Sequence, residues 1–241
     1  MNPGRPKLFV VSPKKERVLT PRKRLKADER ERRIADAAIQ FFAENGFEGQ
    51  TRELAKRIGI TQPLLYRYFP SKEALIERVY QEVFVNRWNP LWNEWLADRS
   101  QPLEGRLVRF YQDYSQMILS YEWVRLFLFS GLRGLDINRR YVNLLRNRIF
   151  SRVITEIRHT YQQPPLDRIP MTETEVEIIW ALHAGIFYLG VRRWIYGLSI
   201  PADLNRVIAE KVAVLLGGVA AMFTVMGRAE VAPLQRKRLD R

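Results

Sequence analysis

Apolar residues recur at spacings of three and four along most of the chain, a pattern typical of amphipathic helices. The first such run holds Ile34, Ala38 and Phe41 and ends at Gly46, and Asp28 with Glu31 predicts a capping box at its start. No alternating strand pattern persists for more than a few residues. We therefore expect an all-α fold, with further helices over 51–58, 62–69, 72–96, 103–120, 122–132, 137–161, 173–196 and 204–226.

The second and third helices are short and lie close together in the sequence. Thr51 is the expected N-cap of the first, and Gly59 supplies the break between them. Pro63 fits the first turn of the next helix, Pro70 ends it, and Ser71 caps the helix that follows. The pattern predicts a helix-turn-helix within a domain of residues 27–80. The residues expected to hold it together are Leu54, Ala55, Ile58, Ile60, Leu65 and Phe69.

The last two predicted helices contain long uncharged runs, at 178–191 and 212–226. Each run is shorter than the roughly 18–20 apolar residues that span a bilayer, so no membrane partner is expected. A helix that is apolar all round has to be buried on all sides. We expect the helices at about 173–196 and 204–226 to form a homodimer interface, in which small residues permit close helix approach: Ala181, Ala184, Gly185, Gly190, Gly217, Gly218, Ala220 and Ala221.

Positive charge is concentrated near the N-terminus. The formal net charge is +14, and residues 1–72 hold 17 Lys/Arg against 8 Asp/Glu, a balance of +9. A localised basic region is expected of a protein that binds a polyanion such as nucleic acid. Residues 1–26 read as a flexible basic arm, 81–228 as a helical ligand-binding and dimerisation domain, and 229–241 as a basic tail.

Composition argues against several chemistries. The chain has no cysteine and two histidines far apart in sequence, which gives poor support for a metal site or a histidine-based triad. No nucleophile–base pair or phosphate loop is present, so no enzyme activity and no cofactor are expected. The lack of cysteine and of a secretory signal suits a cytoplasmic protein.

The outer surface of the helix-turn-helix offers the groups that read DNA. The second helix of this motif enters the major groove with its N-terminal residues nearest the bases. Gln62 suits an adenine edge, Arg52 or Arg67 a guanine or a phosphate, and Pro63 and Leu64 a thymine methyl. Hydroxyl and ammonium groups suit phosphate oxygens. The predicted DNA-binding residues are Thr51, Arg52, Thr61, Gln62, Pro63, Leu64, Tyr66, Arg67, Tyr68 and Lys72.

The segment "FFAENGFEGQTRELAKRIGITQPLLYRYFPSKEALI" resembles the DNA-binding domain of the tetracycline-repressor (TetR) family of bacterial regulators. The resemblance covers roughly residues 28–80. It implies a helical dimer released from a palindromic operator by a small molecule. By position it implies phosphate contacts for Thr51, Tyr66, Tyr68 and Lys72, and base-facing positions for Arg52, Gln62, Pro63 and Leu64. Position 68, commonly histidine in the family, is tyrosine here.

Residues 81–196 are rich in aromatic side chains, and the resemblance implies that some of them line an effector pocket. Ordinary core packing is the alternative for each. The candidates are Trp88, Trp92, Tyr111, Tyr114, Trp123, Phe127, Trp180, His183 and Phe187. The arginines of 137–161 read either as a docking face for an anionic ligand or as a solvated face.

The sequence favours a dimeric, sequence-specific transcriptional regulator. The resemblance implies a repressor, since most members of the family are repressors. The sequence does not identify the effector. The alternative is a nucleoid-associated architectural protein without a ligand. The two differ in sequence dependence, because the architectural protein would bind any A·T-rich duplex similarly.

Overall fold

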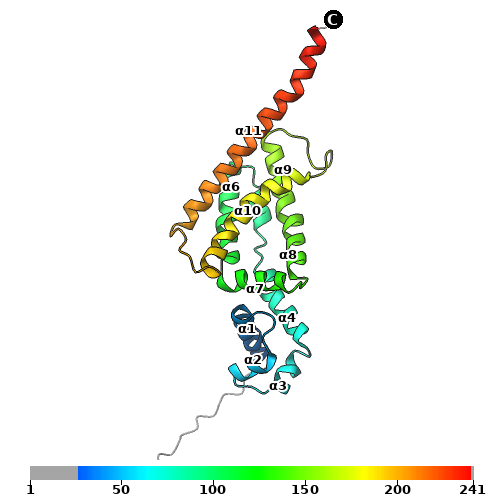
Figure 1. Cartoon of the computed structure of the whole chain (residues 1–241). Helices are drawn as coiled ribbons and strands as arrows, with labels where there is room; N and C mark the ends of the chain where they lie inside the picture. Colours follow the sequence, from blue (N-terminus) through cyan, green and yellow to red (C-terminus); the bar gives the residue numbers. More distant parts are fainter. Residues whose placement is uncertain (1–26, 240–241) are drawn as a thin grey trace, which may run out of the picture.

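The computed structural model describes the backbone of residues 27–239 and the side chains of residues 27–222. The predicted arm 1–26 lies outside the described residues, as do the side chains of the predicted tail 229–241. The described part is 74% helical and contains no strand, which confirms the all-α prediction. Figure 1 shows a small domain of α1–α4 below a larger helical bundle.

The helices follow in simple order along the chain. The small domain contains α1 (Ala27–Asn45), α2 (Thr51–Arg57), α3 (Gln62–Tyr68) and α4 (Lys72–Tyr80). The bundle contains η1 (Gln81–Val85), α5 (Trp92–Ala97), α6 (Leu103–Ile118), α7 (Tyr121–Leu132), α8 (Ile137–Leu145), η2 (Arg146–Phe150), α9 (Ser151–Thr160), α10 (Glu173–Trp194) and α11 (Leu204–Leu239).

Two predicted helix starts are wrong. α1 begins at Ala27, so Asp28 lies inside its first turn, and Glu31 pairs with Arg78 at 2.5 Å instead of completing a capping box. α2 has Gln50 as its N-cap, without a side-chain bond, and Thr51 is its first helical residue. Ser71, by contrast, caps α4 as expected, since its Oγ accepts a hydrogen bond of 3.0 Å from the Ala74 N–H.

The predicted single helix over 72–96 is interrupted. α4 ends at Tyr80, one π-turn follows as η1, and α5 begins only at Trp92. The break has a physical cause in Pro90, because a proline disfavours helical backbone at the residue before it, here Asn89. The link between the two domains is therefore α4 with η1, not a long rod.

The predicted helix over 137–161 is also divided, by the π-turn η2 between α8 and α9. Its apolar stripe repeats every four residues, which drifts around an ordinary helix of 3.6 residues per turn. A π-turn adds a residue to one turn and brings the stripe back into line. The stripe stays buried on both sides of η2, at Tyr141, Leu145, Ile149, Val153 and Ile157.

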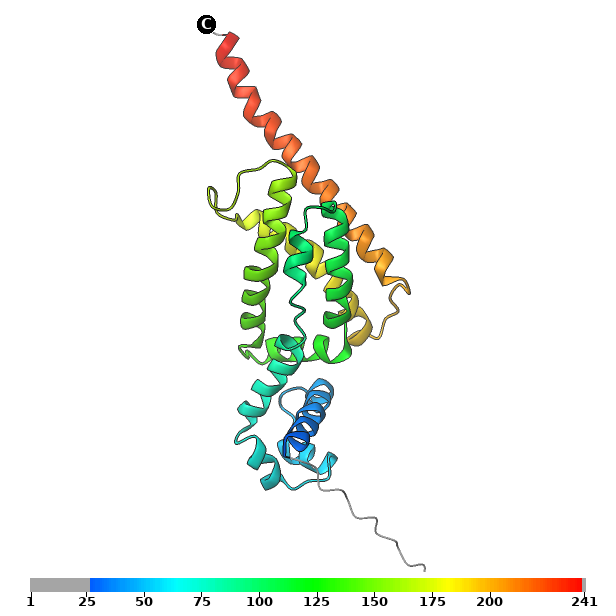
Figure 2. The ribbon, with the colours of Figure 1, turned by 180° about the vertical axis from the view of Figure 1, so that it is seen from behind.

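The last helix is longer than expected. α11 reaches Leu239 rather than ending near 226, and Figures 1 and 2 show its C-terminal half projecting beyond the bundle. Among the described residues, α10 is the one helix long and apolar enough to cross a membrane, with 44% of that window buried. A single such helix is weak evidence for a membrane span, because the core helix of a soluble protein meets the same criteria of length and composition.

Candidate nucleic-acid interface

α2 and α3 cross at a small apolar contact that sets the shape of the interface. Leu54, Ala55, Leu65 and Phe69 are buried, as predicted. Gly59 turns the chain between the helices with φ of +69°, a conformation that L side chains rarely adopt. Thr61 then caps α3 through a hydrogen bond of 3.4 Å from the Leu64 N–H. The cap orients the N-terminal turn of α3 outward.

Thr51 joins the two helices through its hydroxyl. Its Oγ1 lies 2.8 Å from the Tyr66 hydroxyl and accepts a hydrogen bond of 3.1 Å from Gln62 Nε2. The Thr51 side chain is buried, so its hydroxyl serves this junction in the structure rather than facing solvent. The bond fixes the Gln62 amide while its Oε1 and second N–H remain available to a base edge.

The other predicted contacts are all at least partly accessible to solvent. Arg52, Thr61, Pro63 and Arg67 are exposed, while Gln62, Leu64, Tyr66, Tyr68 and Lys72 are half-buried. Among the described ion pairs, none involves Arg52, Arg67 or Lys72. Such cations are available to phosphate oxygens.

Lys56 is a further exposed cation of α2 without a described ion pair, and the sequence analysis did not select it. Its neighbour Arg57 is engaged within the domain, where it forms a fork with the Glu44 carboxylate. The helical spacing of Arg52 and Lys56, four residues apart, was the signal that placed both on one face.

Two short helices joined at a glycine turn, with unpaired cations along their outer surface, define a helix-turn-helix DNA-binding protein. Comparison with known proteins agrees. Residues 34–79 match the family model of bacterial regulatory proteins, tetR family. The chain is 29% identical over 147 residues to the HTH-type transcriptional repressor KstR of Rhodococcus jostii, covering 58% of this chain and 67% of that protein.

A second relative matches a shorter stretch of the chain. The nucleoid occlusion factor SlmA of Actinobacillus pleuropneumoniae is 43% identical over 70 residues, which span 27% of this chain and 34% of that protein. A TetR-like regulator from Rhodococcus sp. RHA1 has the same fold, with a TM-score of 0.57 at 19% identity over 81% of this chain and all of that one. Residues 34–79 thus have the sequence of a tetR-family DNA-binding domain, and these likenesses together support a DNA-binding regulator of that kind.

The small domain contacts the bundle at several points, and two of them are joints made by Arg125 and Arg140. At the first, Arg125 of α7 donates to the carbonyl oxygens of Ala43 and Glu44 at the C-terminus of α1, and its guanidinium lies over Phe129. At the second, Arg140 of α8 forms a fork with Glu77 of α4, at 2.7 and 2.9 Å. Hydrogen bonds from Arg140 hold the pKa of the Glu77 carboxyl below its ordinary value.

The sequence analysis did not identify these joints. Arg125 is the one basic residue within α7, and a lone cation in an otherwise apolar helix was the available signal. Arg140 is one of several arginines in its region, so nothing in the local pattern distinguishes it. Its partner Glu77 lies 63 residues away in the sequence.

The predicted effector residues lie in one connected aromatic cluster inside the bundle. Tyr114 is its centre, with rings 5.2 Å from Trp92 and 5.5 Å from His183, and its hydroxyl lies 2.7 Å from that of Tyr141. Tyr141 in turn lies 5.1 Å from Trp123. The remaining candidates join through further ring contacts: Trp88, Tyr111, Phe127, Trp180 and Phe187. Tyr141 is a member that the prediction omitted.

Three polar atoms in this cluster are buried without a hydrogen-bond partner among the described residues: Tyr111 Oη, Trp123 Nε1 and His183 Nδ1. Burial lowers the pKa of His183 to about 3, so the imidazole is neutral at physiological pH. Burial also raises the pKa of Tyr111 above its ordinary value. The cluster is therefore uncharged and has unused hydrogen-bonding capacity.

The arginines of 137–161 are mostly engaged within the chain. Arg140 pairs with Glu77, Arg152 with Glu156, and Arg158 with Glu175. Arg158 also donates to the carbonyl oxygens of Pro164, Ile169 and Pro170, which secures the segment between α9 and α10. These contacts favour neither a free anionic docking face nor a wholly solvated one.

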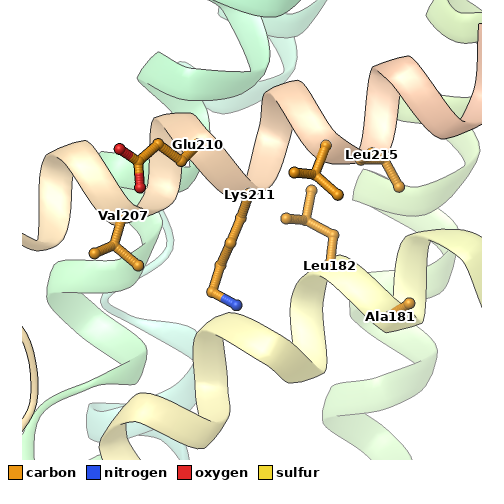
Figure 3. A pocket seen from close by; sticks show the side chains of 7 residues that line it. Ala181, Leu182, Val207, Glu210, Lys211 and Leu215 are labelled. Atoms are coloured by element: carbon orange, nitrogen blue, oxygen red, sulfur yellow. The ribbon is translucent and has the colours of Figure 1, made fainter.

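A groove of about 480 Å³ lies between α10 and α11, separate from the aromatic cluster. Its lining residues are Ala181, Leu182, Val207, Glu210, Lys211, Val214 and Leu215. Figure 3 shows Lys211 extending from α11 toward α10 across this groove. None of the nine predicted effector residues lines it.

Proposed function

We propose that the protein is a homodimer that binds a palindromic operator and leaves it when a small molecule occupies the aromatic cluster. The observation that carries the DNA-reading part is the Thr51–Gln62 hydrogen bond, which holds an amide at the N-terminal turn of α3. A preoriented amide flanked by unpaired cations is suited to reading a base edge while phosphates fix the register.

The dimer part of the proposal is supported by exposed apolar stripes on α10 and α11. Ala181, Ala184 and Tyr188 are exposed along α10, and Ala213, Val214, Gly217, Gly218 and Ala221 along α11. The stripes consist mainly of small residues, which allow two helices to approach closely. Among the other predicted small residues, Gly185 and Ala220 are half-buried, and Gly190 is buried where α10 packs against Val124 of α7. A second copy would cover these stripes in an isologous contact.

The release part is supported by the two joints. α7 carries Trp123 into the aromatic cluster and Arg125 to α1, while α8 carries Tyr141 into the cluster and Arg140 to α4. A ligand that displaced α7 or α8 would therefore act on these joints of the small domain. DNA and ligand would then prefer different separations of the two α3 helices, and the coupling would be reciprocal.

Selection of bound sequences from random duplex DNA, followed by binding measurements on variants, tests the proposal. We expect two inverted half-sites. Gln62→Ala should cost about 1–3 kcal/mol at particular base pairs. Lys72→Ala should weaken binding to all sequences and lower the salt slope by about one. Arg146→Ala, an exposed charge removal in the bundle, is the matched control and should change neither.

The architectural alternative has one observation in its favour, the 43% identity over 70 residues to a nucleoid occlusion factor. That likeness spans 27% of this chain and 34% of that protein, so it says nothing of the greater part of either chain. If selection yielded no common motif, and Gln62→Ala and Lys72→Ala weakened specific and random DNA equally, the architectural function would replace the proposed one.

A further inference from the structure

We propose that the effector is an uncharged, ring-containing molecule with a hydrogen-bond acceptor, held by Tyr111, Trp123 and His183. This inference rests on the proposed function, since it names the class of molecule for the same aromatic cluster. The three residues come from three helices, α6, α7 and α10, and their polar atoms are buried.

The unpartnered atoms belong to one cluster rather than to scattered sites. Tyr114 connects them, because its ring lies 6.4 Å from Tyr111 and 5.5 Å from His183, and its hydroxyl meets Tyr141 beside Trp123. Buried polar groups in proteins nearly always have a hydrogen-bond partner. Three that lack one in the same core point to a molecule that supplies the missing partners.

The donor set specifies the ligand's polar part. The indole N–H of Trp123 can only donate, so the ligand must present an acceptor such as a carbonyl or ether oxygen. The Tyr111 hydroxyl can donate or accept, and the neutral imidazole of His183 can do either at Nδ1, according to its tautomer. The ligand must therefore carry one hydrogen-bond acceptor, and Tyr111 or His183 can bind a second polar group of the ligand.

The surrounding charges argue against an ionic ligand. The buried carboxylate Glu156 is already paired with Arg99 and Arg106, and Asp113 accepts from Trp92 Nε1 and Asn89. Asp113 and Arg148 reach only Trp92 and Trp88, and among the described ring contacts and hydrogen bonds no Asp, Glu, Lys or Arg contacts Tyr111, Trp123 or His183. An ionic group placed there would lose its hydration without gaining a counter-ion.

The apolar part of the ligand is set by the ring walls. Phe127 and Phe187 stand edge to face with each other at 5.7 Å, and Trp180 meets His183 in the same way at 5.3 Å. All three are half-buried, so rotation of their side chains would give a molecule access to the cluster. A flat ring system matches such walls, since aromatic rings prefer offset or edge-to-face contact.

Three probes of one shape test the class in full-length protein: 2-acetylnaphthalene, 2-ethylnaphthalene and 2-naphthoate. Titration calorimetry should show the ketone binding about tenfold more tightly than the hydrocarbon, in keeping with one hydrogen bond gained. The anion should bind most weakly. Equal affinity for ketone and hydrocarbon, preference for the anion, or no binding of any probe at its solubility limit would each overturn the inference.

Variants locate the site. Trp123→Phe keeps a ring and removes the donor, so it should remove the preference for the ketone while leaving hydrocarbon binding in place. Tyr111→Phe, which removes one hydroxyl from the same site, is the second test variant in case Trp123→Phe does not fold. Trp95→Phe is the control, because Trp95 packs under Arg109 outside the cluster. If Trp123→Phe and Tyr111→Phe both kept the full ketone preference, the assigned site would be wrong.

DNA binding of the probe-free protein is measured separately, so the two proposals can fail independently. If the wild-type protein showed no sequence-specific DNA binding, the proposed regulatory function would be rejected and the preference for the ketone probe would still stand. Absence of ketone preference would reject the ligand class and leave the operator intact.

Discussion

Arg125 of α7 donates a hydrogen bond of 3.2 Å from Nη2 to the carbonyl oxygen of Glu44, so one domain caps the last turn of a helix in the other. The final carbonyls of a helix have no partner within it, and a cation there also interacts favourably with the helix dipole. Tyr121 and Phe129 flank the guanidinium at 5.3 and 5.0 Å. Arg125 therefore helps to orient α1 against α7, together with the hydrogen bond from Gln40 to Glu122.

Arg125→Met should lower the free energy of unfolding by about 1–2 kcal/mol, because charge-assisted hydrogen bonds to the end of α1 are lost. Amide exchange in the last turn of α1 should quicken. Denaturant unfolding and hydrogen exchange measure both effects. The control is Arg139→Met, which breaks an exposed pair with Asp136 and should stay within about 0.5 kcal/mol of wild type. Equal effects of the two substitutions would contradict a capping role.

Thr51→Val keeps the shape of the side chain and removes the hydroxyl that Tyr66 and Gln62 share. We expect specific DNA binding to weaken about tenfold, since the Gln62 amide loses its fixed orientation. Random-sequence binding should change little, because no phosphate-neutralising charge is removed. Thr160→Val, in the bundle, is the control. Unchanged specific affinity, measured by anisotropy on the selected operator, would show that the junction has no part in reading bases.

The sequence predicted the helix-turn-helix well because its signals are local. Gly59, Pro63 and Ser71 act within one or two turns of themselves, and the structure has each where the pattern put it. The assignment of Thr51 as an N-cap was wrong for a non-local reason. Its hydroxyl bonds to Tyr66, 15 residues away, and that interaction does not show in the spacing of nearby residues.

The candidate effector residues were chosen for being aromatic, and the structure brings them together. What the sequence could not indicate is which polar atoms of that cluster lack partners, because this depends on how α5, α6, α7, α8 and α10 meet. The domain joints are unpredictable for the same reason, since Arg125 and Ala43 are 82 residues apart. The break at Pro90, in contrast, was readable from the chain, and the prediction of one helix over 72–96 overlooked it.

The buried histidine gives stability a defined pH dependence. Burial lowers the pKa of His183 to about 3 from 6.5, so the unfolded chain binds a proton that the folded chain does not take up between these values. With respect to this histidine, the free energy of unfolding therefore keeps its full value above pH 6.5 and decreases as the pH falls toward 3. The loss amounts to about 2 kcal/mol at pH 5, from about 1.4 kcal/mol per pH unit.

His183→Leu should remove that part of the slope, so its unfolding free energy should change less than that of wild type between pH 7.5 and 5. Urea unfolding at each pH measures the difference. His159→Leu is the matched control, because His159 is exposed, and its profile should follow wild type. If His183→Leu and wild type lost stability in parallel, the histidine would be protonated in the folded protein.

Val214 lies in the exposed apolar stripe of α11 with 76% of its surface accessible, so a charge placed there should be tolerated by the isolated chain. In the proposed dimer the same position would be buried against a second copy, where an unpaired carboxylate is strongly unfavourable. Val214→Glu should therefore yield monomers in equilibrium sedimentation at micromolar concentration and weaken binding to a two-half-site operator. Leu132→Glu, at a position 85% exposed on α7, is the control and should remain dimeric. A monomeric wild type, or a Val214→Glu variant that stayed dimeric, would contradict the proposed interface.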